Sequence, residues 1–337
     1  MSFKKSLCFD DVLIKPRYSD ISSRKEINTH RDLGAGILLD VPLISSPMDT
    51  VTEASMVSAM SQSGGIGIIH RYNSIEEQAL QVAKCSDANV GFAIGTGDDA
   101  VERASACVNA GANLICIDVA HGHHELVRYT LQVLRNTFGT SVHIMAGNVA
   151  TAEGHQALSD WGADSVRVGI GGGSICSTRV QTGHGMPTFQ SVLDCAWHGG
   201  PAAIIADGGI RTSGDIVKAI AAGADAVMLG SLLAGTIESP GGLVHKAGGN
   251  YKAYRGMASK DAQMEWRGHY SSVEGVTSYV PSRGHASTVI GELVRGFRSG
   301  LSYSGCRDIS ELHLNAKFIQ QSPLGNVESG THILKRG

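Results

Sequence analysis

The sequence lacks every cysteine pattern that would indicate a disulfide framework or a zinc site. Its seven cysteines are odd in number and widely spaced, and they contain no Cys-x-x-Cys pair. Disulfides persist mainly in oxidising compartments, so this usage predicts a reducing, cytoplasmic location. Cys107, Cys116 and Cys195 lie in apolar segments, and we expect them to be small buried residues of the interior.

Long apolar runs and basic clusters are missing as well. No run approaches the length of a membrane-spanning helix, and residues 1–16, MSFKKSLCFDDVLIKP, contain no apolar core of a secretory signal. The formal net charge is −3 without a block of basic residues, which argues against a nucleic-acid surface. The sequence therefore predicts a partner that is neither a membrane nor a nucleic acid.

Prolines are few, at eight, whereas glycines number 43 and avoid low-complexity runs. Many glycines close a helix-like segment that is followed at once by an apolar run, as in VNAGANLICID (108–118) and AAGADAVMLG (221–230). A glycine just past a helix end accepts the left-handed conformation that closes the helix. The apolar run after it is typical of a parallel strand buried on both faces.

This pattern predicts eight strands, which begin near residues 41, 66, 90, 114, 142, 165, 202 and 226. Most of them start about 23–28 residues apart, which suits eight strand–helix units. A doubly wound open sheet is the alternative, but it seldom repeats so evenly. We therefore predict an α/β protein of one domain, residues 1–337, folded as a (β/α)8 TIM barrel. It would carry long active-site loops, a flap at about 240–284, and a C-terminal helix (about 285–301) and polar tail within 285–337.

Two stretches break the repeat, and both follow predicted strands. About 37 residues separate the sixth and seventh strands, and this excess contains VGIGGGSICSTR (168–179). Residues 235–290, after the eighth strand, have no regular pattern and are expected to be irregular. Because barrel active sites form at the carboxyl ends of strands, both stretches are predicted to lie at the active site.

The last two strands end in residues that suit a nucleotide. Backbone N–H groups after these strands hold a phosphate in many barrels, although the glycines could equally be ordinary turn residues. Ser213 is expected to cap the next helix, and Asp207 to accept hydrogen bonds from sugar hydroxyls. The predicted phosphate site comprises Gly208, Gly209, Gly230 and Ser231.

Cys176 could be an inert residue, a metal ligand or a nucleophile. Its loop is long, rich in glycine and close to Arg179, which could favour a thiolate able to attack an electrophilic ring carbon. The preceding GIGGGS resembles a dinucleotide fingerprint only loosely, because the Gly-x-Gly-x-x-Gly spacing is not met. The histidines at 121, 123 and 124 lack a matching acidic or cysteine cluster, so they favour polar or ligand contacts over a metal site.

Seven motifs together resemble the IMP dehydrogenase/GMP reductase family, from about residue 5 to 315 in unbroken order. They are SSPMDTVTEA (45–54), GGIGIIH (64–70), AGNVAT (146–151), GIGGGSICSTR (169–179), DGGIRTSGDIVKA (207–219), MLGSLLAG (228–235) and YRGMAS (254–259). The resemblance implies a (β/α)8 barrel, usually a homotetramer. It also implies chemistry at C2 of a purine nucleotide through a cysteine adduct, with NADPH or NAD as the cofactor.

The resemblance also implies roles for residues at matching positions. Cys176 would be the nucleophile, and Thr178 and Glu274 would be its catalytic partners. The cofactor would contact Asp118, Val119, Ala120 and His121, and backbone carbonyls of Gly171, Gly173 and Cys176 would hold a monovalent cation such as K⁺. The nucleotide would be held by Ser46, Met48, Ser174, Asp207, Gly208, Gly209, Gly230, Ser231, Tyr254, Gly256 and Met257.

Two reactions remain open within this family. A dehydrogenase oxidises IMP to XMP and needs a base for water, which the family supplies as an Arg-Tyr pair on a long flap. Here residues 256–275 look about eight residues shorter than that flap and contain no Arg-Tyr dipeptide, since Gly-His separates Arg267 from Tyr270. The usual inserted regulatory domains are missing too. Arg255 and Thr236, in contrast, resemble the dehydrogenases.

We therefore favour a GMP reductase, which converts GMP to IMP and ammonia with NADPH, over an IMP dehydrogenase. A barrel that binds nucleotide without turnover is a third alternative, and the presence of Cys176, Thr178 and Glu274 argues against it. The sequence leaves open the choice between NADH and NADPH and the possibility of a deoxynucleotide or modified purine as substrate.

Overall fold

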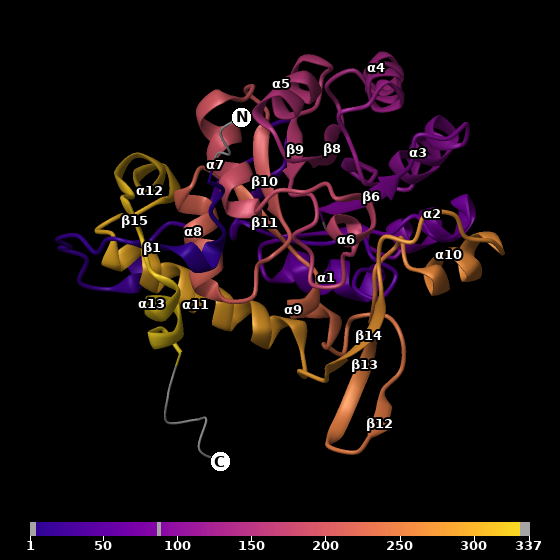
Figure 1. The fold of residues 1–337 in the computed structure, drawn as a ribbon. Helices are drawn as coiled ribbons and strands as arrows, with labels where there is room; N and C mark the ends of the chain where they lie inside the picture. Colours follow the sequence, from indigo (N-terminus) through magenta and orange to yellow (C-terminus); the bar gives the residue numbers. More distant parts are fainter. Residues whose placement is uncertain (1–4, 86–88, 331–337) are drawn as a thin grey trace.

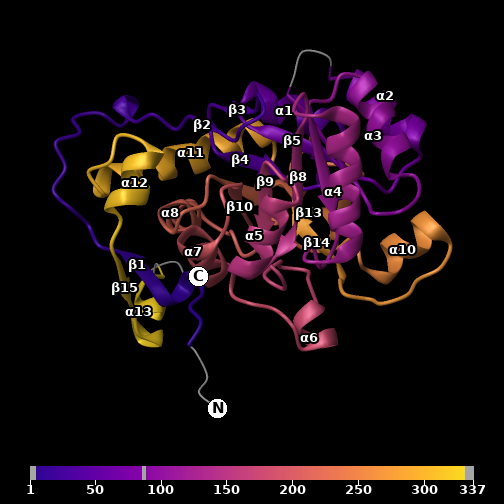
Figure 2. The same ribbon diagram turned by 90° about the horizontal axis from the view of Figure 1, so that it is seen from above.

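The computed structural model describes residues 5–85 and 89–330, and its centre is a closed barrel of eight parallel strands. Around the barrel the strands follow the order β10, β11, β4, β5, β6, β7, β8, β9. Figures 1 and 2 show the barrel from two directions. The bounds of the strands are β4 Leu43–Ser45, β5 Ile66–Ile69, β6 Val90–Ile94, β7 Leu114–Asp118, β8 His143–Val149, β9 Ser165–Val168, β10 Ala203–Asp207 and β11 Ala226–Leu229. Each predicted strand is present, and the TIM barrel is confirmed.

The barrel strands are apolar because both of their faces are covered. One set of side chains fills the interior, where Ile44, Ile68 and Met145 are fully buried. A short hairpin of β2 (Arg31–Asp32) and β3 (Leu38–Leu39) adds Ile37 to this interior cluster. The interior is therefore a packed core, as in other barrels of this type.

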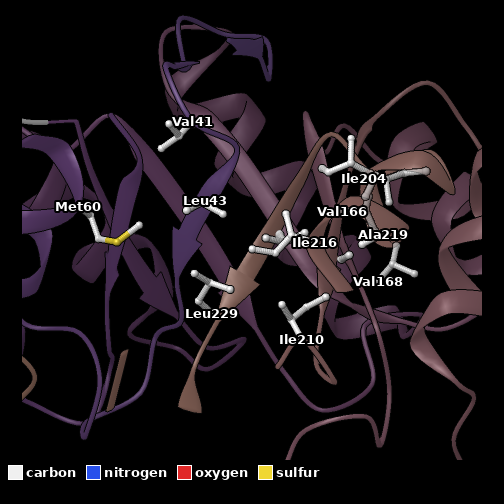
Figure 3. Close-up of a cluster of buried hydrophobic side chains, with 14 of the residues drawn as sticks. Val41, Leu43, Met60, Val166, Val168, Ile204, Ile210, Ile216, Ala219 and Leu229 are labelled. Atoms are coloured by element: carbon white, nitrogen blue, oxygen red, sulfur yellow. The ribbon is translucent and has the colours of Figure 1, made fainter. Parts of the chain in front are cut away.

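The opposite faces of the strands pack against an outer ring of helices. Figure 3 shows part of this layer, in which Ile216 and Ala219 of one helix lie among strand residues such as Val166 and Leu229. The ring comprises α1 Ala54–Gln62, α2 Ile75–Ala83, α3 Ala100–Asn109, α4 Glu125–Phe138, α5 Ala152–Asp160, α7 Thr188–His198, α8 Ser213–Ala221 and α11 Ala286–Tyr303. Burial of both layers is the main stabilising contribution to this fold.

The start of α8 differs by one residue from the prediction. Thr212, not Ser213, is the N-cap: its hydroxyl accepts a hydrogen bond from the Asp215 amide at 3.2 Å. The Asp215 carboxylate in turn accepts from the Thr212 amide at 3.2 Å, which completes a capping box. Both residue types cap well, and only Thr212 has the extended backbone that a cap requires.

The prediction of an irregular stretch at 235–290 was wrong. This region contains a three-stranded antiparallel sheet of β12 (Val244–Lys246), β13 (Gly249–Arg255) and β14 (Thr277–Pro281). It also contains the helix α10 (Lys260–Arg267) between β13 and β14, and the short helix α9 (Ser231–Ala234) directly precedes it. In Figure 1 the sheet projects away from the barrel, which explains its largely polar and exposed sequence.

The C-terminal segment is also more ordered than a polar tail. After α11 come α12 (Ile309–Asn315), β15 (Phe318–Gln320) and α13 (Pro323–Glu328). β15 pairs antiparallel with β1 (Val12–Ile14), which follows the short 3-10 turn Phe9–Asp11. A strand near the start of the chain therefore pairs with a strand near its end, and the pair lies near α8 (Figure 1). Residues 1–4 and 331–337 of the predicted domain lie outside the described residues.

Candidate active site

A cavity of about 650 Å³ lies at the carboxyl ends of the barrel strands. It is lined by the segments after most of the strands and by the flap between β13 and β14. All the residues predicted to act in catalysis, nucleotide binding or cation binding line this cavity, and so do Asp118, Val119 and Ala120. His121 is not among the lining residues. The structure thus brings together every predicted site residue except this histidine.

Cys176 begins a continuous chain of hydrogen bonds. Its thiol donates to the Thr178 hydroxyl at 3.2 Å, and this hydroxyl donates to Oε2 of Glu274 at 2.8 Å. Cys176 is exposed to the cavity, in contrast to Cys107, Cys116 and Cys195. Burial raises the pKa of each of these three to about 12, so they are interior residues, as predicted.

The flap positions Glu274 by pairing with the cysteine loop. The Ser177 amide donates to the Glu274 carbonyl at 2.9 Å, and the Val276 amide donates to the Ile175 carbonyl at 3.0 Å. Cys176 and Gly275 thereby form an antiparallel bridge. The cysteine loop and the flap, which are distant in the sequence, are thus joined by backbone hydrogen bonds beside Cys176. These bonds fix the position of Glu274 relative to the thiol.

The glycines of the cysteine loop are required by close packing. Gly169 has a φ of +150°, and a Cβ atom there would lie 1.9 Å from the Asp207 carbonyl oxygen. Only glycine can occupy this position, because both the conformation and the contact exclude a side chain. Arg179 does not turn toward the thiol as expected: its Nη2 donates to the Met186 carbonyl at 2.7 Å.

Arg167 is a buried cation that the sequence analysis missed. Its side chain is 8% exposed and joins two carboxylates, Asp118 at 2.6 Å and Asp207 at 2.8 Å. Burial opposes the charge, but Asp207 and Asp118 nevertheless raise the pKa of Arg167. The signal was visible in the sequence, since an arginine within the apolar run SVRV would need a buried partner.

Asp207 is held in place by several donors. Besides Arg167, the Asn148 side chain donates to its Oδ2 at 2.8 Å, and the same amide group donates to the Gly169 carbonyl at 2.8 Å. These bonds use one carboxylate oxygen of Asp207. The other oxygen receives none of these bonds, and Asp207 lines the cavity, so the carboxylate retains the capacity to accept hydrogen bonds from a ligand.

Three of the predicted nucleotide residues pack around a fourth, Gly230. A Cβ atom at this position would lie 2.8 Å from the Tyr254 hydroxyl, 3.3 Å from the Ser46 hydroxyl and 3.5 Å from the Met48 sulfur. The Ser46 hydroxyl is buried and has no hydrogen-bond partner in the protein. Burial raises the pKa of Tyr254 to about 12, so its hydroxyl stays protonated and can donate. This corner therefore offers hydroxyl groups to a ligand.

The predicted phosphate corner has left-handed glycines and a nearby cation. Gly208 and Gly209 have φ values of +96° and +81°, a backbone conformation that glycine adopts without strain. Arg211, which the sequence analysis did not single out, also lines the cavity here. Its guanidinium pairs with Asp10 and lies 3.6 Å from Asp215. Its side chain is 55% exposed, so it remains accessible to an anion.

The opposite side of the cavity contains Asp118 and Arg71. Asp118 lies between two guanidinium groups, Arg167 at 2.6 Å and Arg71 at 3.7 Å. Nearby, burial lowers the pKa of His121, and the neighbouring histidines lower it further.

Within the described residues, no three His, Cys, Asp or Glu side chains are arranged to hold a metal ion. No helix in that part of the chain is long and apolar enough to cross a membrane.

Comparisons with known proteins agree with this geometry. Residues 6–332 match the model of the IMP dehydrogenase / GMP reductase domain. The chain is 34% identical to an inosine-5′-monophosphate dehydrogenase of Nitrosopumilus maritimus, over 98% of this chain and 99% of that protein. It is 33% identical to a GMP reductase of Leishmania major, over 98% of each. The chain is therefore about equally similar to a relative named as a dehydrogenase and to one named as a reductase.

The alignments with these relatives extend over 474 and 482 residues, more than the 337 of this chain. Both relatives thus contain segments that this chain lacks, and the lack of inserted domains does not separate the two activities. The fold also resembles a GMP reductase variant of Trypanosoma brucei, solved with guanosine 5′-monophosphate. The TM-score is 0.93, with 31% identity over 98% of each chain. The chain belongs to the IMP dehydrogenase/GMP reductase family and is a purine nucleotide oxidoreductase.

Proposed function

We propose that the chain is a GMP reductase, which converts GMP, NADPH and a proton to IMP, NADP⁺ and ammonia. One observation carries the proposal. Within residues 256–275, all of which the structure describes, the ionisable side chains that line the cavity are Arg267 and Glu274. The flap thus presents a carboxylate to the cysteine but no tyrosine.

The position of Tyr270 supports this choice. Tyr270 does not line the cavity; its ring centroid lies 4.8 Å from the Lys260 ammonium of α10. A dehydrogenase of this family activates water with an adjacent Arg-Tyr pair, and Arg267 and Tyr270 do not form such a pair here. Oxidation of IMP to XMP requires that base, whereas reductive deamination does not.

The proposed reaction begins with attack of the Cys176 sulfur on purine C2. The carbon–nitrogen bond to the 2-amino group then breaks, and ammonia leaves with a proton that Thr178 relays from Glu274. That proton comes from the Cys176 thiol, which passes it through Thr178 to Glu274 along hydrogen bonds of 3.2 and 2.8 Å before the sulfur attacks. Bound NADPH would supply a hydride to C2, after which the carbon–sulfur bond breaks and restores the cysteine.

The cavity wall supplies the binding groups that this reaction needs. The hydroxyls of Ser46 and Tyr254, with Ser174, Met48, Gly256 and Met257, would surround the base and ribose. Asp207 would accept hydrogen bonds from the ribose hydroxyls. The phosphate would lie against the N–H groups of Gly208, Gly209, Gly230 and Ser231, with Arg211 nearby.

The cofactor side fits a nicotinamide ribose. Asp118 is fixed by Arg167 and Arg71 and faces the cavity, so its carboxylate could accept hydrogen bonds from ribose hydroxyls, beside Val119 and Ala120. A K⁺ ion would be held by the backbone carbonyls of Gly171, Gly173 and Cys176. The Cys176 amide donates to the Gly173 carbonyl at 3.1 Å, and this turn brings the last two of these residues close together. The proposal includes a cytoplasmic homotetramer, as the family resemblance implies.

IMP dehydrogenase is the second candidate. Arg255 and Thr236 resemble that branch, and Arg267 reaches the cavity from the flap. If the chain is a dehydrogenase, Arg267 is the flap residue placed to activate water.

Two assays separate the candidates. Purified protein is mixed with GMP and NADPH, and separately with IMP, NAD and K⁺, while nicotinamide absorbance is followed and products are identified. Loss of NADPH with formation of IMP and ammonia supports the reductase. Formation of NADH and XMP contradicts it. Tight GMP or IMP binding without turnover under either condition would indicate a non-catalytic nucleotide-binding barrel.

A further inference from the structure

Arg255 connects the flap helix α10 to the barrel. Its Nε and Nη2 donate to Oδ2 of Asp49 at 3.0 and 2.6 Å, and its Nη1 lies 2.6 Å from Oε2 of Glu265. Asp49 follows the barrel strand β4, whereas Glu265 belongs to α10. The Asp49 side chain is 9% exposed and that of Glu265 is 71% exposed. One guanidinium thus joins a buried anchor to a solvent-facing helix.

A second contact between α10 and the barrel is aromatic. The Trp266 ring stacks on Tyr72, which follows β5, with 5.8 Å between centroids and 13° between planes. The Tyr72 hydroxyl donates to the Met257 carbonyl at 2.8 Å. The guanidinium of Arg267 lies 5.9 Å from the Tyr72 centroid and that of Arg71 lies 5.5 Å from it, as in cation–π pairs. Tyr72 therefore fixes the C-terminal turn of α10.

The position of α10 is transmitted to the segment before β14 that carries Glu274. Gln263 of α10 is 3% exposed, and its amide group donates to the carbonyls of Ala258 at 3.1 Å and Ser272 at 2.9 Å. The Ser271 amide donates to the Gln263 side-chain oxygen at 3.2 Å. Gln263, Ser271 and Ser272 also line the cavity. A shift of α10 would therefore change the cavity wall next to Glu274.

We propose that Arg255 is a positioning residue that, together with the Tyr72–Trp266 stack, holds α10 across the mouth of the cavity. Arg255 does not itself line the cavity, so its effect is exerted through Glu265 and the helix. Arg255 is typical of the dehydrogenases, although this chain has a short flap. Fastening the flap helix α10 gives this arginine a role here. The effect on turnover rests on the proposed function, whereas the fastening does not.

Fluorescence of Trp266 tests the fastening without turnover. Trp161→Phe and Trp197→Phe together leave Trp266 as the single tryptophan, whose quenching by acrylamide is then measured. Arg255→Lys keeps a positive charge beside Asp49 but cannot contact both carboxylates, because an ammonium is a point charge and not a fork. Glu265→Gln removes the other end of the contact at an exposed position, where the fold tolerates change.

We expect both substitutions to raise the quenching constant of Trp266 about twofold, because α10 samples open positions more often. Glu125→Gln is the matched control: Glu125 is 70% exposed and pairs with Arg128 at 2.5 Å on another helix, α4. If Arg255→Lys and Glu265→Gln are quenched like the control while circular dichroism is unchanged, the inference is overturned.

A kinetic measurement adds a readout that a purely structural role would not change. With GMP and NADPH as substrates, we expect the KM for the cofactor to rise several-fold while kcat changes less. The cavity wall loosens, but the bond from Thr178 and the backbone bonds to the cysteine loop still hold Glu274 beside Cys176. An equal loss in kcat and in kcat/KM with an unchanged KM contradicts the positioning role. Absence of any reductase activity would contradict the proposed function, and the quenching result would still decide whether α10 is fastened.

Discussion

Thr178 and Glu274 are joined by a hydrogen bond of 2.8 Å across 96 residues of sequence. Thr178 begins the short helix α6 (Thr178–Thr182), whereas Glu274 lies on the flap. Because the Thr178 hydroxyl also accepts from the Cys176 thiol at 3.2 Å, it can pass a proton in either direction. The flap therefore has a chemical role as well as a covering role.

Glu274→Gln tests this relay. Glutamine can still accept the hydrogen bond from Thr178, so the loop should keep its shape, but it cannot supply a proton to departing ammonia. We expect kcat for ammonia release from GMP to fall by about 10²–10⁴-fold, with little change in GMP affinity measured by calorimetry. Glu125→Gln is the control. A kcat within about threefold of the parent would remove Glu274 from the chemistry.

Gly230→Ala tests the nucleotide corner. The φ of Gly230 is −108°, which is not in the left-handed region, so the effect argued here is the steric one of an added Cβ atom. Its Cβ atom would lie 2.8 Å from the Tyr254 hydroxyl and 3.3 Å from the Ser46 hydroxyl. We expect Tyr254 to shift and the nucleotide affinity to fall about tenfold or more, since a misplacement of about 1 Å is costly.

The control for this substitution is Gly242→Ala, since a Cβ atom at Gly242 has no neighbour within 4 Å. Binding of GMP to both variants would be compared by calorimetry. Equal affinities for the two variants would show that the nucleotide does not depend on this corner.

The barrel could be predicted because its strands are buried on both faces and recur at a regular interval. The flap sheet could not, because β13 and β14 are half exposed and polar, and their pairing joins segments without an apolar pattern. The segment β15 was missed for the same reason: three residues pair with β1 at the far end of the chain. Short exposed strands leave little signal in a sequence.

The residues of the site could largely be placed from the carboxyl ends of the strands. Arg167 was missed because it lies within a strand rather than after it, where its side chain still reaches Asp118 and Asp207. The position of His121 could not be predicted, since proximity to Asp118 in the sequence does not determine which way a loop side chain turns. The direction of the strands determines which residues reach the cavity end of the barrel, whereas the local conformation of each loop determines whether a side chain such as His121 turns into the cavity.

Arg167→Met tests the buried ion cluster. The substitution leaves the carboxylates of Asp118 and Asp207, each 17% exposed, without their shared cation. We expect the free energy of unfolding in urea to fall by about 3–5 kcal/mol, because an uncompensated buried charge is strongly destabilising. Asp207→Asn added to Arg167→Met should recover part of the loss. Full additivity of the two effects would contradict a direct interaction.

Two buried histidines and one partly buried histidine predict how stability depends on pH. Burial lowers the pKa of His143, His155 and His313 in the folded protein. In His143, Nδ1 lies 3.0 Å from the Gly34 carbonyl and Nε2 lies 2.7 Å from the Ser165 hydroxyl. The carbonyl requires a donor and the hydroxyl can donate to the second nitrogen, so the neutral ring fits this position.

The unfolded protein binds more protons at these histidines than the folded protein does. Their contribution to stability is therefore complete above about pH 6.5, the ordinary histidine pKa, and is lost as the pH falls toward their lower folded values. Each such proton adds a slope of about 1.4 kcal/mol per pH unit. We expect urea unfolding to show a decrease between pH 7.5 and 5, above the range where carboxylates titrate. His143→Gln, which can still bond to Gly34 and Ser165, should flatten this slope. A slope unchanged in that variant would mean that His143 takes up no proton on unfolding.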